Sequence, residues 1–118
     1  MPSLFEVSAG KLAGPTTGGT VTQATNKTTG VTLNAESGQI TMNNAALGAA
    51  GEASFTVTTD KIAATDVVVV NHVSAGTAGS YLAQANTVAA GSFAITVTNV
   101  SGGSLSEAIV LKYCIIKG

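Results

Sequence analysis

Polar and apolar residues alternate along most of this chain in short runs separated by turns rich in glycine and asparagine. Residues 52–58 and 92–100 alternate strictly, which places every second side chain on one face of a strand. About eight such runs follow one another at roughly ten-residue spacing, without a helical stripe, and this pattern predicts an all-β sandwich. The predicted inward face contains Phe55, Val57, Val68, Val70, Phe93, Ile95 and Val97.

Two runs depart from simple alternation because they are apolar on both faces. Residues 67–70 are four consecutive valines, a pattern typical of a strand that is buried on both sides. The last run, residues 105–117, has one apolar face made of Ile109, Leu111, Tyr113 and Ile115. Its other face carries Val110, Lys112, Cys114 and Ile116. Either this strand is central and covered within the monomer, or these four residues form a subunit interface.

The first eighteen residues differ from the rest. Gly10, Gly14 and Pro15 interrupt every short apolar run, so residues 1–18 are predicted to form an extended arm preceding a β-sandwich domain at 19–118. The apolar side chains of this arm need cover, either from their own domain or from a neighbouring subunit. They are Leu4, Phe5, Val7 and Leu12.

Composition limits the classes of function. The chain has 118 residues, enough for one domain, and only 9% are charged, against about 25% in an ordinary soluble domain. It contains no arginine and has a net charge of −1, which argues against nucleic acid as a partner. No apolar run is long enough for a membrane span and no signal peptide is visible, so we expect synthesis in a cytoplasm. The charge deficit predicts an obligate oligomer with covered surfaces.

Residues suited to catalysis or metal binding are few, and we expect neither an enzyme nor a cofactor. A Ser-His-Asp triad would need Asp60 or Asp66 to meet His72, and a Cys–His pair would need Cys114 to do so. We expect instead a strand-end histidine that is satisfied by backbone groups or faces a subunit boundary. The two aspartates lack Asp-x-Asp spacing, so turn capping is a better interpretation than calcium binding.

Several stretches of the chain, taken as strings, resemble a family of small virion proteins of tailed bacteriophages and prophages. The similarity covers about the last hundred residues and is carried by residues 19–25, 29–34, 38–42, 63–71, 105–111 and 115–118. These motifs contain no catalytic residue.

The resemblance implies a capsid decoration (cement) protein on the virion surface, made in the host cytoplasm. The implied fold is a single antiparallel, jelly-roll-like sandwich, and the implied assembly is a homotrimer. The N-terminal arm would then bind the major capsid protein. The alternative is a module of a tail or head fibre that adheres to the host.

Overall fold

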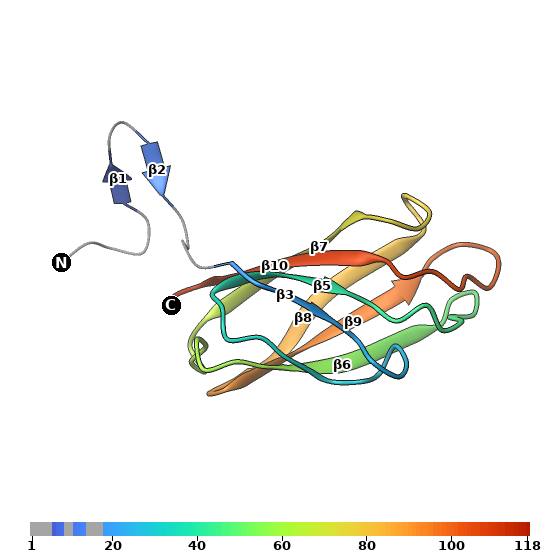
Figure 1. Ribbon diagram of the computed structural model, residues 1–118, viewed down its shortest axis with the longest axis horizontal. Coiled ribbons are helices and arrows are strands. Elements are labelled where there is room, and N and C mark those ends of the chain that lie inside the picture. Colours follow the sequence, from blue (N-terminus) through green and yellow to red (C-terminus); the bar gives the residue numbers. More distant parts are fainter. Residues whose placement is uncertain (1–5, 9–10, 14–17) are drawn as a thin grey trace.

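The computed structural model describes residues 6–8, 11–13 and 18–118, which form β-strands joined by turns and loops (Figure 1). Within these residues there is no helix, and hence none that could cross a membrane. The strands are β1 (Glu6–Ser8), β2 (Lys11–Ala13), β3 (Thr20–Thr22), β4 (Val31–Thr32), β5 (Ser37–Thr41), β6 (Glu52–Thr58), β7 (Val67–Ser74), β8 (Tyr81–Ala89), β9 (Ser92–Asn99) and β10 (Val110–Ile116).

Eight of these strands form two four-stranded sheets, with the orders β3-β5-β10-β7 and β4-β6-β9-β8. The all-β prediction is therefore confirmed. The prediction of a purely antiparallel fold is wrong at two edges, because β3 pairs in parallel with β5 and β4 pairs in parallel with β6. The reason is that the chain changes sheet between β3 and β4 and returns at β5. Jelly rolls are built from antiparallel Greek keys, and these parallel pairs depart from that plan.

One apolar core lies between the sheets and joins them into a sandwich. The burial of β6 and β9 alternates residue by residue, as their sequences predict. The Phe93 ring on β9 meets the Tyr113 ring on β10 edge-on, at 5.2 Å between centroids, so the contact crosses from one sheet to the other. All seven predicted inward residues belong to this core, with Val68 partly buried and the other six buried.

A buried asparagine organises the loop that leaves β9. Asn99 is inaccessible to solvent, and its amide Nδ2 donates to the carbonyl oxygens of Leu47 and Gly103, each at 2.8 Å. Its Oδ1 accepts hydrogen bonds from the backbone N–H and the hydroxyl of Ser101. The side chain therefore joins the backbone of residues 47, 101 and 103 around the end of β9.

Within the predicted arm, β1 and β2 form an antiparallel hairpin in which Val7 is paired with Leu12. Among the described strands, these two belong to neither of the larger sheets. Leu4 and Phe5 lie outside the described residues. The described part of the arm thus folds back on itself, where the glycine and proline pattern predicted only an extended segment.

Candidate subunit interface

The four candidate interface residues lie on the outer face of β10. This strand is central in its sheet, between β5 and β7, and its inner face is buried. On the outer face Lys112 is exposed, whereas Val110, Cys114 and Ile116 are half-buried. This face is thus only partly buried within the described part of the chain, and its role as a subunit interface stays a prediction.

The four-valine run occupies the edge strand β7. Val68 and Val70 point into the core, as predicted. Val67 and Val69 point outward, and 56% and 47% of their surfaces are exposed. The prediction that this strand is buried on both faces is therefore wrong for the monomer, since only the face that carries Val68 and Val70 packs on the core.

The outward valines continue the candidate interface of β10. In the antiparallel register, Val69 lies beside Cys114 and Val67 lies beside Ile116. We call these four residues the apolar patch. The next outward pair is polar, Asn71 beside Lys112, and it borders the patch. An apolar centre with a polar rim is the arrangement found at protein interfaces.

Exposed apolar side chains occur on both sheets of the sandwich. Among the described residues, the large hydrophobic side chains that remain exposed are Val67, Val69, Val73, Leu82 and Val100. They lie on β7, on β8 or just after β9. The sequences of β7 and β8 contain no Asp, Glu, Lys or Arg. These two strands therefore carry no carboxylate, lysine or arginine, although Asn71, Gln84 and Asn86 make them partly polar.

Cys114 is a poor nucleophile in this position. Burial, together with the negative charge of Glu36, raises the pKa of its thiol above the ordinary value. Its Sγ contacts the backbone oxygen of Ile115 at 3.9 Å. Because the thiolate is the reactive form, Cys114 acts as a small apolar residue of the patch rather than as a catalytic group.

His72 is held by backbone oxygens, as the sequence predicts. Its Nε2 lies 3.0 Å from the carbonyl oxygen of Ser74 and 2.6 Å from that of Ala75. Its ring packs edge-on against Tyr81, with 5.5 Å between the centroids. The polar contacts of Asp66, in contrast, are with residues 63, 117 and 118, so the structure does not assemble a His72–Asp66 pair.

Glu107, which the sequence analysis did not single out, fastens the loop after β7. Its carboxylate accepts hydrogen bonds from the Tyr81 hydroxyl at 2.8 Å and from the backbone N–H and hydroxyl of Thr77. The Tyr81 bond, followed by the Thr77 bonds, lowers the pKa of Glu107. Burial, with a smaller effect of Glu107, raises the pKa of Tyr81 to about 12.

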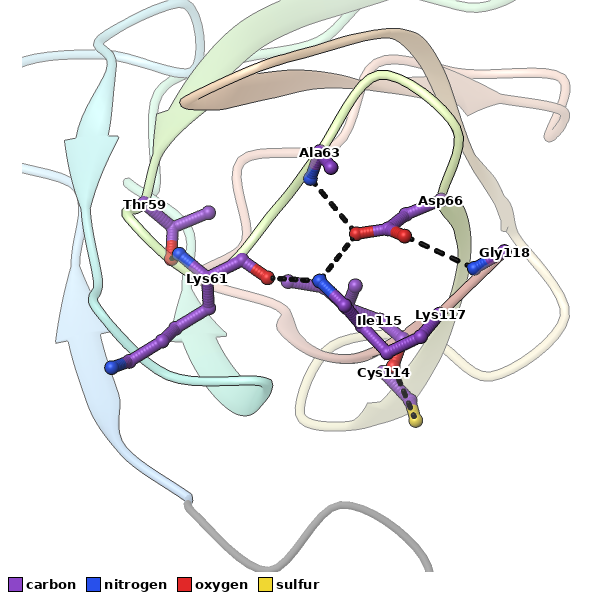
Figure 2. Close-up of polar contacts among 8 residues, drawn as sticks. All are labelled: Thr59, Lys61, Ala63, Asp66, Cys114, Ile115, Lys117 and Gly118. Atoms are coloured by element: carbon purple, nitrogen blue, oxygen red, sulfur yellow. Dashed lines mark hydrogen bonds and ion pairs between the residues drawn. The ribbon is translucent and has the colours of Figure 1, made fainter. Parts of the chain in front are cut away.

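Asp66 caps a turn, as predicted, and also anchors the end of the chain (Figure 2). Its Oδ2 accepts from the Ala63 N–H at 2.8 Å and from Lys117 Nζ at 2.6 Å, and its Oδ1 accepts from the Gly118 N–H at 3.1 Å. Lys117 Nζ also donates to the Lys61 carbonyl at 2.9 Å. The hydrogen bond from Lys117, followed by the bond from Ala63, lowers the pKa of Asp66 to about 2.

Asp60 lies on the same loop but has weaker partners. Its carboxylate lies 3.7 Å from Lys61 Nζ in an exposed ion pair, and its backbone N–H donates to Asn34 Oδ1 at 2.9 Å. Within the described part of the chain, no group of three or more His, Cys, Asp or Glu residues is arranged to hold a metal ion.

Lys27 is a buried cation, which the sequence pattern did not predict. Only 4% of its surface is exposed, and its Nζ donates to the backbone oxygens of Asn43 and Glu107. The neighbouring Gln23 donates to the backbone oxygens of Lys27 and Thr29. Burial lowers the pKa of Lys27, while the charge of Glu107 partly opposes this effect. The lysine ties three loops together at one end of the sandwich.

Comparison of the chain with protein-family models, curated proteins and solved structures finds no match.

Proposed function

We propose that this protein is a bacteriophage capsid decoration (cement) protein with no enzymatic activity. In this proposal a homotrimer binds the major capsid protein on the outside of the virion and stiffens the shell. The resemblance of residues 19–118 to small phage virion proteins supports this assignment. The observation that carries it is the apolar patch, which lies on a strand without Asp, Glu, Lys or Arg in a charge-poor sandwich.

The physical basis of cementing is the burial of this surface at boundaries between subunits. Burying the exposed half of one valine side chain contributes about 1 kcal/mol. Val67 and Val69, with Cys114 and Ile116 beside them, therefore provide a few kcal/mol per contact. Repetition over many copies makes small contacts sufficient to resist the pressure of packaged DNA. Under the same proposal, the arm residues Leu4, Phe5, Val7 and Leu12 attach the sandwich to the shell.

The test is add-back to virions assembled without this protein. Mass spectrometry and cryo-electron microscopy of wild-type virions are expected to place it on the outer shell. Purified protein added to virions that lack it is expected to bind their shells again and to raise the temperature at which DNA is released. Location in the tail or in head fibres would overturn the proposal in favour of a fibre or host-adhesion module, and absence from virions would overturn both assignments.

A further inference from the structure

The edge strands on the two sides of the sandwich differ in length. On one side the edge strands are β3 and β4, which have only three and two residues. On the other side they are β7 and β8, with eight and nine residues. Natural sheets protect open edges with short strands, charges, prolines or bulges. The β3–β4 side is protected by its shortness, whereas the β7–β8 side lacks charge and proline altogether.

Of these two long edges, β7 is the better one for pairing with another strand. Its register with β10 is regular from Val67 to His72, and the shift occurs only at Val73. The first two outward side chains of β7 are the valines of the apolar patch, whereas on β8 the outward Leu82 is followed by the polar Gln84 and Asn86. A strand added beside β7 would therefore extend an apolar surface and satisfy open backbone groups at the same time.

The occupant must be an extended strand that is uncharged and apolar at alternate outward positions. β7 itself meets this description. Pairing an edge with its own copy about a two-fold axis brings residues of the same strand opposite one another, so like charges on that strand would repel. β7 has no Asp, Glu, Lys or Arg, so no such repulsion opposes self-pairing. With the valines kept on one face and the axis near the middle of residues 67–72, Val69 lies opposite Val67, Val69 or Asn71 of the second copy.

We propose that two copies of this chain associate through antiparallel pairing of their β7 edges, forming one continuous eight-stranded sheet across the contact. This contact is two-fold and does not depend on the capsid assignment. It gives a dimer if it acts alone. It gives a hexamer if it joins two of the predicted trimers.

The first test is oligomeric mass by light scattering, with a matched pair of variants. Val69 and Val100 are the same residue type and are 47% and 48% exposed, but only Val69 lies on β7. V69K is expected to halve the mass, from dimer to monomer or from hexamer to trimer, whereas V100K is expected to leave it unchanged. Circular dichroism establishes that both variants fold. A wild-type monomer, or an equal effect of the two variants, would overturn the proposal.

The second test distinguishes edge pairing from simple packing of sheet faces. An unpaired edge strand has amide protons facing solvent at alternate residues, whereas a strand paired on both sides protects all of them. Hydrogen exchange followed by NMR is expected to show that the amide proton of every residue in 67–72 is protected in the wild type. In V69K, every second residue of this range is expected to lose its protection. Alternate protection in the wild type would refute edge pairing even if the protein is oligomeric.

The third test fixes the register by disulfide formation in a Cys114→Ser background. V69C alone reports the register in which residue 69 opposes itself, and V69C with V67C or with N71C reports the two neighbouring registers. One of these variants is expected to form an intermolecular disulfide under mild oxidation, with V100C as the control that does not. Failure of all three would overturn the proposed geometry. Binding to shells is measured separately, so failure of the capsid assignment leaves these results unaffected.

Discussion

The anchoring of residues 117 and 118 by Asp66 yields the most quantitative prediction. The Asp66 side chain is 2% exposed and accepts three hydrogen bonds, one of them from the ammonium group of Lys117. Asp66→Asn removes the negative charge and directs an amide N–H toward groups that are themselves donors. The turn at residues 63–66 and the final residues of the chain would then lose their shared partner.

The pKa of Asp66 provides the magnitude of the expected loss in unfolding free energy. Asp66 shifts from 3.8 to about 2 on folding, and one unit of pKa corresponds to about 1.4 kcal/mol. The charged carboxylate therefore contributes at most about 2 kcal/mol, because the 40% exposure of Lys117 lets solvent screen part of the ion pair. We expect D66N to lower the free energy of unfolding by approximately this amount at pH 6.

The dependence on pH follows from the direction of the shift. The folded state holds the pKa below its unfolded value, so this stabilisation is complete above about pH 4 and is lost as the pH falls toward 2. D66N lacks it at every pH. The difference between wild type and variant is thus expected to be largest near neutrality and to approach zero near pH 2.

Urea denaturation followed by far-UV circular dichroism, at one fixed protomer concentration, measures this difference between pH 2 and pH 7. Asp60→Asn is the matched control, since that carboxylate is 66% exposed and its Lys61 partner lies 3.7 Å away. D60N is expected to change the unfolding free energy by less than about 0.5 kcal/mol. The reasoning is refuted if D66N and D60N behave alike, or if the effect of D66N is the same at pH 2 and pH 6.

Two further predictions concern the buried lysine and the arm. Lys27→Met is expected to lower the unfolding free energy by about 1–3 kcal/mol, because two backbone carbonyl oxygens lose a charged donor; Lys61→Met, at an exposed position, is the control, and equal urea midpoints would contradict the prediction. Deleting residues 2–18 is expected to leave a folded oligomer. When it is added to virions assembled without this protein, it is expected not to bind their shells. Unchanged shell occupancy would assign attachment to the sandwich instead.

Strict alternation made the core predictable from the sequence. A period of two determines which side chains share a face wherever one face is buried, and the pairing of Phe55 with Ile95 and of Val57 with Phe93 follows that rule. A continuous apolar run does not show how many faces of a strand are covered. The valine run therefore predicted two buried faces, whereas only one face of β7 packs on the core and Val67 and Val69 stay exposed on the other.

The long-range polar contacts could not be predicted from the sequence. Lys27 lies in a stretch of asparagine and threonine that reads as an exposed turn, yet its Nζ bonds the backbone of Glu107, eighty positions away. The capping role of Asp66 was predictable, because Ala63 is three residues distant. Its contact with Lys117 was not, because only the sheet topology brings the end of β10 beside the start of β7.

The few charges of this chain help to explain why its β7–β8 side favours association. Lys27 and Asp66 are buried, and Glu107 and Lys117 serve as partners for internal groups. Charges that hold loops and chain ends in place do not contribute to a repulsive outer surface. The long strands β7 and β8 are left without charge, and charge is one of the main means by which natural sheets keep their edges apart. The low content of charged residues in the sequence therefore leaves the β7 edge without charges that would oppose pairing.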